Sequence, residues 1–220
     1  MSFADSSSHP VPAGALAHVL WIGGATDAGK STVADMLAER HGLQVYHYDR
    51  RDLAHHEQLA ATSAVYRTWL DASLDERWIH PEPEEMVETT LRSFRDRFPL
   101  VIEDLLAFPT ERYVVAEGFG LLPEYVAPLL VSPSAALWLV PTDDFKRASM
   151  LRRNKPSFAA RTTNPERARA NLLARDMLLA GYIREQARQR GCTLYEVDGV
   201  RSIEDTVALA ESHFAPFLRG

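Results

Sequence analysis

Two kinds of apolar pattern alternate along the chain. Short, almost continuous apolar runs are followed by longer stretches in which apolar residues recur every three or four positions. Continuous runs of this length are typical of strands buried on both faces, and the longer period is typical of helices. The pattern predicts strands at 17–23, 43–49, 112–118, 135–141 and 192–199.

Helices are predicted between and after these strands, at 31–42, about 143–153, about 165–190 and 202–214. The interval 51–108 is predicted to be mostly helical, because Met86, Val87, Leu91, Phe94 and Phe98 recur at helical spacing. Proline is expected to punctuate this interval, at Pro81, Pro83, Pro99 and Pro109. Alternating strands and helices predict an α/β fold with a parallel sheet covered on both faces.

The sequence predicts one domain, residues 16–220, behind a flexible polar leader, residues 1–15. Two segments stand out from the alternation as insertions. One is the helical interval 50–110, and the other is a loop rich in proline and arginine, 152–165, expected to form a lid.

A compact motif follows the first predicted strand. Gly24-Ala25-Thr26-Asp27-Ala28-Gly29-Lys30-Ser31 fits the phosphate-loop pattern G-x-x-x-x-G-K-[ST], and a helix is predicted directly after it. Glycine lets the backbone approach a phosphate, and successive N–H groups with a helix N-terminus form an anion-binding site. The motif therefore predicts nucleotide binding by residues 24–31.

The last residues of the motif carry its charge and its hydroxyl groups. Lys30, expected to be exposed on its loop, would bind the β- and γ-phosphates of ATP, and the Ser31 hydroxyl would bind Mg²⁺. Thr32 is either a contact for the α-phosphate or a first-turn helix residue.

With this motif and this order of elements, nearly the whole chain resembles the P-loop small-molecule kinases, which include nucleoside, nucleotide, shikimate and gluconate kinases and chloramphenicol phosphotransferase. The resemblance implies a three-layer sandwich with a five-stranded parallel sheet in the order 2-3-1-4-5. It also implies ATP and Mg²⁺, a small-molecule acceptor bound over the helical insertion, and an arginine-bearing lid.

The resemblance assigns roles to two acidic residues at predicted strand ends. Asp49, in "YHYDRRD", would face the acceptor hydroxyl, and Asp52 follows it closely; capping of the next helix is the alternative for Asp49. Glu117, in "YVVAEG", resembles a Walker B acid that orients Mg²⁺, although the commoner residue there is Asp. The alternative for Glu117 is a charged residue that simply marks a strand exit.

Cations gather near the fourth predicted strand and beyond. By resemblance, Arg147 and Arg175 would contact the nucleotide, and Arg152 and Arg153 would stabilise the charge of phosphoryl transfer. Arg175 has an alternative, an ion pair with Asp176 or Glu185. The aromatic residues of the helical interval would form an acceptor wall or belong to the core; these are Tyr66, Trp69, Trp78 and His80.

Composition restricts the remaining classes of partner and function. The net charge of −6 disfavours a nucleic-acid partner, yet 146–190 holds twelve Lys or Arg against three Asp or Glu, as suits a small anionic ligand. One cysteine, no membrane-length apolar run and no secretory signal favour a cytoplasmic monomer or homodimer. A P-loop ATPase or a nucleic-acid-end kinase remains an alternative. A GTPase-like switch is disfavoured, because "NKPS" at 154–157 lacks the aspartate of N-K-x-D.

Overall fold

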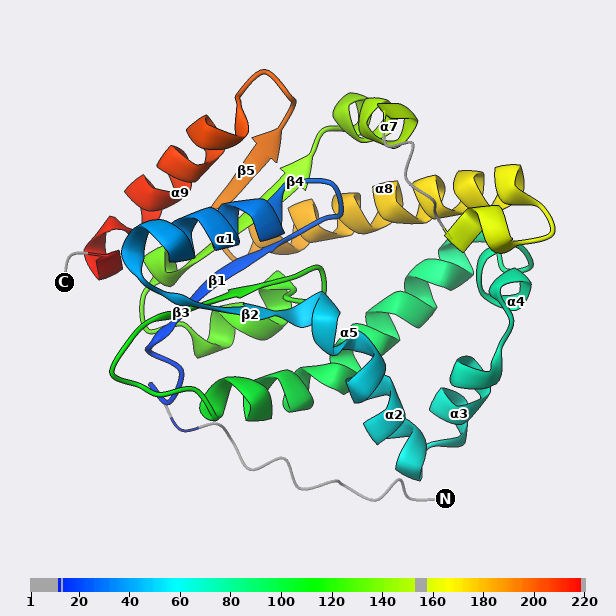
Figure 1. Cartoon of the computed structure of the whole chain (residues 1–220), viewed down its shortest axis with the longest axis horizontal. Helices are drawn as coiled ribbons and strands as arrows, with labels where there is room; N and C mark the ends of the chain where they lie inside the picture. The colour runs from blue at the N-terminus through cyan, green and yellow to red at the C-terminus, as the bar shows by residue number, and fades with distance from the viewer. Residues whose placement is uncertain (1–11, 13, 153–157, 219–220) are drawn as a thin grey trace.

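The computed structural model describes residues 12, 14–152 and 158–218. Within these residues, five parallel strands form one sheet in the order β2-β3-β1-β4-β5, as the resemblance implies (Figure 1). The predicted strand limits are correct to within two residues. The strands are β1 (Val19–Gly24), β2 (Gln44–His47), β3 (Val114–Glu117), β4 (Ala136–Pro141) and β5 (Leu194–Val197).

Every helix expected outside the interval 51–108 is present: α1 (Lys30–His41), α7 (Asp143–Arg152), α8 (Pro165–Gln189) and α9 (Ile203–Leu218). The short helix α6 (Pro123–Val126) and three 3₁₀ turns were not predicted; the turns are η2 (Ala127–Leu129), η3 (Pro133–Ala135) and η4 (Phe158–Arg161). A further 3₁₀ turn, η1 (Tyr48–Arg51), ends β2 earlier than predicted.

The interval 51–108 folds as separate helices: α2 (Asp52–Thr62), α3 (Ala64–Asp71), α4 (Leu74–Trp78) and α5 (Pro83–Leu106). Pro83 begins α5, where its missing N–H costs nothing. Pro99 was expected to punctuate this region, but α5 continues through it. The buried residues on both sides of Pro99, among them Phe94 and Val101, pack in one core and hold the helix together across the missing hydrogen bond.

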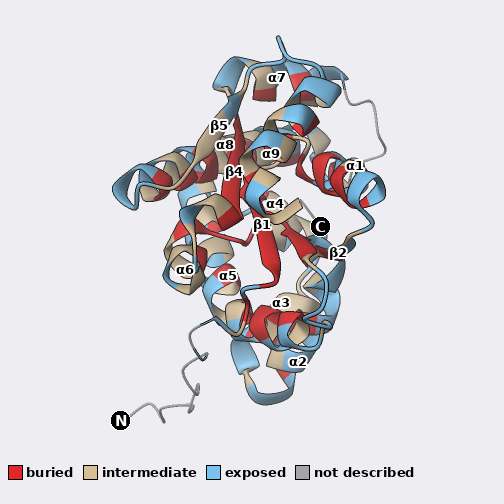
Figure 2. Ribbon diagram, turned by 90° about the vertical axis from the view of Figure 1, so that its left-hand side faces the viewer, coloured by how far each residue is buried: buried red, intermediate tan, exposed pale blue. Residues whose placement is uncertain are grey.

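The sheet is the middle of three layers. On one face, Trp21 and Trp138 of the sheet pack with residues of α5, α6 and α8, and on the other face Leu20 and Leu137 pack with α1 and α9. Figure 2 shows the central strands buried throughout, with the exposed surface carried by helices and loops. Burial on both faces explains why these strands read as continuous apolar runs.

The strand register brings three strand ends together. Glu117, the last residue of β3, pairs with Ile22 of β1 and with His47 of β2. The loop after β1, the turn after β2 and the end of β3 therefore lie at one edge of the sheet. In open parallel sheets this carboxyl edge is where ligands bind.

Parts of two expected segments lie outside the described residues: most of the leader 1–15 and residues 153–157 of the expected lid, including Arg153 and Lys155. Among the helices of the described residues, none has the length and apolar content that a membrane span requires.

Candidate functional site

The loop between β1 and α1 has an unusual backbone. Gly24 has a φ of 124°, and a Cβ placed there would lie 1.9 Å from the carbonyl oxygen of Leu139. Gly29, with a φ of 79°, caps α1, and Asp27 adopts a φ of 65° although it is not glycine. Only glycine satisfies both the conformation and the space at position 24, which explains the first residue of the motif.

Lys30 is the first residue of α1, and only 7% of its surface is exposed. The expectation of an exposed lysine was therefore wrong, because the loop folds back over the side chain: Lys30 Nζ donates a hydrogen bond to the carbonyl oxygen of Ala25 at 2.7 Å. Burial lowers the pKa of Lys30, while the carboxylates of Asp49, Glu117 and Asp27 oppose this shift.

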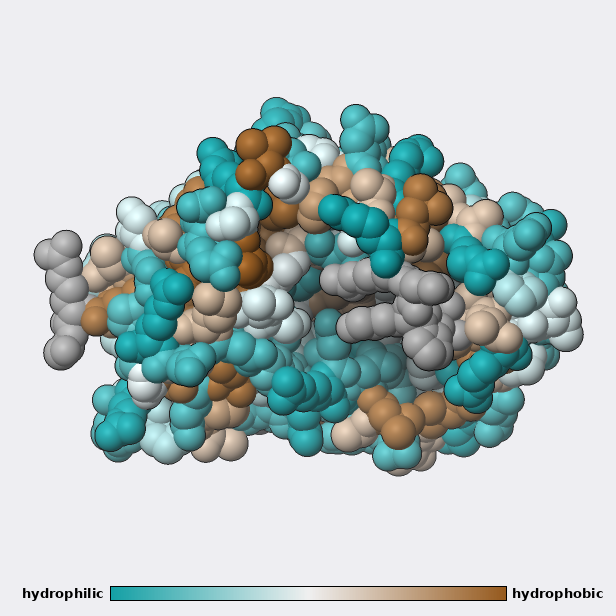
Figure 3. Space-filling view, turned by 45° about the horizontal axis from the view of Figure 1, so that its top comes forward, coloured by the Kyte–Doolittle hydropathy of each residue, from teal (hydrophilic) through white to brown (hydrophobic). Residues whose placement is uncertain are grey.

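A cavity of about 250 Å³ lies against the loop. Its lining includes most of the predicted motif and one residue from elsewhere in the chain. These residues are Thr26, Asp27, Gly29, Lys30, Ser31, Thr32 and Asp49. Figure 3, turned so that the top of Figure 1 comes forward, shows a hollow in this face of the molecule, with hydrophilic side chains below it and both hydrophilic and hydrophobic ones above it.

Asp49 reaches this cavity because of how η1 packs. Its neighbour Tyr48 is fully buried, and Gly118 and Gly120 leave room for the tyrosine side chain: a Cβ on Gly118 would lie 2.3 Å from Tyr48 Cβ. Tyr48 thus fixes the turn that carries Asp49. Since Asp49 is the second residue of η1 and α2 begins at Asp52, it does not cap α2.

The pKa of the Asp49 carboxyl group is raised. Burial is the largest cause of the rise in its pKa above the usual range; Glu117 and Asp52 add to the rise, and Lys30 opposes it. A carboxyl group in this environment holds a proton more readily than a solvated aspartate, as suits a group that accepts a proton from a substrate.

Glu117 is the last residue of β3, at the same edge of the sheet, and is 1% exposed. One of its oxygens, Oε1, lies 2.8 Å from His47 Nδ1, while the buried oxygen Oε2 has no hydrogen-bond partner. His47 Nε2 lies 3.3 Å from Asp35 Oδ1 of α1. A buried carboxylate oxygen without a partner, at the edge that also carries Ser31, fits a water molecule bound to Mg²⁺. Among the described residues, no group of three or more His, Cys, Asp or Glu side chains could by itself hold a metal ion.

The predicted lid cations are not gathered at the cavity. Arg147 and Arg152 are both exposed, and the Arg152 guanidinium lies 5.5 Å from the centre of the Phe145 ring. The next predicted cation, Arg153, lies outside the described residues. Neither Arg147 nor Arg152 therefore lines the cavity.

For Arg175 the structure shows the alternative, an ion pair with Asp176. Arg175 Nη2 donates to Asp176 Oδ1 at 2.6 Å, and the guanidinium lies 5.1 Å from the centre of the Trp78 ring. Asp176 is itself buried and accepts a 2.7 Å hydrogen bond from the Thr26 hydroxyl. Arg175 is thus connected to the phosphate loop through Asp176.

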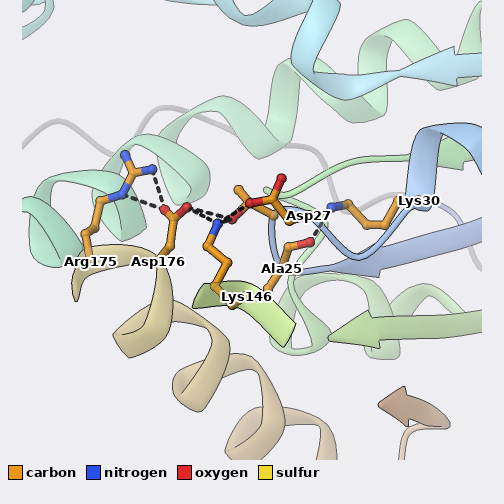
Figure 4. A network of polar contacts seen from close by, with 7 residues as sticks. Ala25, Asp27, Lys30, Lys146, Arg175 and Asp176 are labelled. Carbon is orange, nitrogen blue, oxygen red and sulfur yellow. Dashed lines mark hydrogen bonds and ion pairs between the residues drawn. The ribbon is translucent and has the colours of Figure 1, made fainter. Parts of the chain in front are cut away.

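The sequence reasoning missed Lys146, and it considered Asp176 only as an ion-pair partner of Arg175. Lys146, which precedes Arg147 on α7, is 4% exposed, and its ammonium group contacts the loop residues Thr26 and Asp27 (Figure 4). Two signals could have indicated it. The chain has few lysines among many arginines, and an acidic residue inside an anion-binding loop requires a nearby cation.

Of the residues proposed as an acceptor wall, Tyr66, Trp69 and Trp78 pack against other protein rings, and His80 is exposed. His56 stacks on Trp69 with 4.2 Å between ring centres and also contacts Tyr66. Trp78 packs against Phe158 at 4.4 Å. The buried residue His55 lies beside Asp104, which also accepts hydrogen bonds from Tyr46 and Arg51. These contacts anchor the helices beside the cavity.

Comparisons with known proteins give structural matches only. No family model and no curated protein matched the chain. Structural matches include a gluconokinase from Sinorhizobium meliloti 1021, with a TM-score of 0.45 and 15% identity over 90% of this chain and 91% of that one. An uncharacterized protein from Eubacterium ventriosum ATCC 27560 has a TM-score of 0.43 and 13% identity, over 90% and 98%. Shikimate kinase from Bacteroides thetaiotaomicron has a TM-score of 0.38 and 12% identity, over 88% and 96%.

Two of these three matches are named as kinases of the group that the sequence resembles. The phosphate-loop motif, the strand order and the cavity at the carboxyl edge together define a P-loop α/β fold. At identities of 12 to 15%, we infer the function of this chain from its own residues.

Proposed function

We propose that the chain is a phosphotransferase that moves the γ-phosphoryl group of ATP to a hydroxyl or phosphate group of a small acceptor. The observation that carries the proposal is the shared cavity, in which Lys30 and Ser31 of the loop and Asp49 of η1 line one space. A bare nucleotide binder has no need for an acid on the wall opposite its phosphate loop.

In this proposal each wall of the cavity has its own task. The loop 24–31 and Thr32 bind the phosphates, with Lys30 at the β- and γ-phosphates. Asp49 orients an acceptor hydroxyl and takes its proton while the acceptor oxygen bonds to the γ-phosphorus and the bond to the ADP oxygen breaks. Ser31 and Glu117, the latter through water, would hold Mg²⁺, which neutralises phosphate charge when bound.

Arginines on the α7–α8 side complete the proposal. Arg147 and Arg152 are exposed and lie outside the cavity lining, so they would reach the nucleotide only after a movement of the C-terminal part of α7. Arg153 would act with them. Arg175 would exchange its bond to Asp176 for a phosphate, since guanidinium binds phosphate in a bidentate manner. Substrate-driven closure of this kind is common in phosphotransferases.

The test is ATP turnover by the full-length chain with Mg²⁺, alone and with a panel of nucleosides, nucleoside monophosphates, sugar acids and aminoglycoside or phenicol antibiotics. We expect turnover close to background without an acceptor and a rise of at least about 100-fold with the right one. Rapid acceptor-independent hydrolysis would identify an ATPase, and turnover that depends on nucleic-acid ends would identify an end kinase. Failure of ATP to bind would refute the proposal altogether.

A further inference from the structure

The phosphate loop carries an acidic residue in a place that should attract anions. Asp27 stands inside the motif and lines the cavity. An uncompensated carboxylate there would repel the phosphates of a nucleotide, because like charges a few ångströms apart in a partly desolvated site interact strongly. The loop can accept a polyphosphate only if a cation neutralises Asp27.

Lys146 is in contact with this carboxylate. Its Nζ lies 2.6 Å from Asp27 Oδ2 and 2.6 Å from Thr26 Oγ1 on the loop. A third contact, also 2.6 Å, joins Nζ to Asp176 Oδ2 of α8. Figure 4 shows the ammonium group between the two carboxylates, with Arg175 on the far side of Asp176. The loop, α7 and α8 thus meet at one buried lysine.

Two negative and two positive charges meet in this cluster. Asp27 and Asp176 each carry one negative charge, and Lys146 and Arg175 each carry one positive charge. Burial opposes ionisation of Asp176, but Arg175 and Lys146 outweigh it and hold its pKa below the usual range. Asp176 therefore stays ionised and keeps Lys146 in place beside the loop.

We propose that Lys146, held by Asp176, is a positioning residue that neutralises Asp27 on the phosphate loop and so allows the cavity to bind a nucleoside triphosphate. The inference rests on the proposed function and adds a requirement to it. It also explains why an acidic residue is tolerated inside an anion-binding loop. The role differs from that of Lys30, because Lys146 acts through Asp27 and not on the phosphates.

A direct contact of Lys146 with the nucleotide is the competing explanation, and a double variant separates the two. Lys146→Met removes the cation and leaves the carboxylates in excess. Asp27→Asn removes the carboxylate that needs neutralising, and asparagine tolerates the positive φ at position 27. The double variant Lys146→Met/Asp27→Asn restores the charge balance without restoring the lysine.

The measurement is the Kd of ATP with Mg²⁺ by isothermal titration calorimetry on the full-length chain, which needs no turnover. We expect Lys146→Met to weaken ATP binding at least about tenfold. Asp27→Asn alone should bind ATP more tightly than wild type, because Lys146 keeps its charge while the loop loses a carboxylate. The double variant should bind within about threefold of wild type, because compensation is no longer needed.

Three results would overturn the inference. They are wild-type affinity in Lys146→Met, a double variant that binds as weakly as Lys146→Met, and an Asp27→Asn variant that binds ATP much more weakly than wild type. Thermal unfolding checks that each variant is folded, and Asp27→Asn alone still tests the inference if Lys146→Met does not fold. Failure of wild type to bind ATP would instead refute the proposed function, so the two failures are distinct.

Discussion

The two walls of the cavity are built in different ways. The loop wall is one continuous segment, in which Gly24 and Gly29 set the backbone and Lys30 follows directly. The facing wall depends on distant contacts, because Tyr48 of η1 packs against Gly118 beyond β3 and so places Asp49. One wall is therefore specified by local backbone geometry and the other by tertiary packing.

Removing Lys30 is the most severe way to break the loop wall. Lys30→Met should lower kcat/KM for ATP by roughly 10³-fold or more, because it removes an electrostatic clamp on the transferred group. The fold should survive, since burial already disfavours the charged form of Lys30 and a methionine avoids that cost. Steady-state kinetics measure the fall in kcat/KM, and a thermal melt shows whether the variant is folded. Retention of a tenth of wild-type activity would place the nucleotide elsewhere.

The same change should leave the facing wall intact. In Lys30→Met the acceptor should still bind, and its Kd by calorimetry should stay within about threefold of wild type, because Tyr48 and Gly118, not Lys30, place Asp49. A large loss of acceptor affinity would show that the walls act as one unit.

The difference between the walls explains what the sequence could predict. The strands and the loop Gly24–Ser31 are signalled by residues close together in the chain, and the structure has them where they were predicted. The order of the sheet was implied by the resemblance and is confirmed. The contact of Asp27 with Lys146 and the contact of Thr26 with Asp176 were not predicted, because each joins residues more than a hundred positions apart that follow no motif. Asp49 was singled out from its place at a strand end, but its support by Tyr48 and the glycines requires the structure.

The substitution Asp49→Asn tests the wall that carries this carboxylate. It should lower kcat by roughly 10²-fold, at the low end of general-base effects, because phosphoryl transfer depends mainly on positioning. The Kd of ATP should barely change, in contrast to Lys146→Met. Single-turnover kinetics with saturating acceptor measure the chemical step. An unchanged kcat would move the acceptor-side role to Asp52, Glu117 or Asp104.

Gly118→Ala tests whether Tyr48 places Asp49. The added Cβ would lie 2.3 Å from Tyr48 Cβ, which is next to the backbone and cannot swing away. Overpacking of this kind should cost about 1–3 kcal/mol of unfolding free energy and displace η1. We therefore expect kcat to fall more than ATP affinity, measured alongside urea unfolding. The matched control is Gly181→Ala in α8, where a Cβ meets nothing within 4 Å and the helix should gain stability.

The smallest effect concerns the charge of Asp49 and the stability of the protein. Because its pKa is raised in the folded state, mainly by burial, the folded protein binds the proton more tightly than the unfolded chain does. The contribution of Asp49 to stability is therefore complete below its unfolded pKa and is lost as the pH rises through its folded pKa. Asp49→Asn should raise the Tm at a pH above the folded pKa, where the wild-type carboxylate is ionised against its surroundings. The gain should shrink as the pH is lowered through the folded pKa. Paired melts of wild type and variant across this range measure it. A variant less stable than wild type above the folded pKa would contradict this prediction. It would mean that the ionised carboxylate stabilises the folded protein, because attraction to Lys30 outweighs burial and the acidic neighbours.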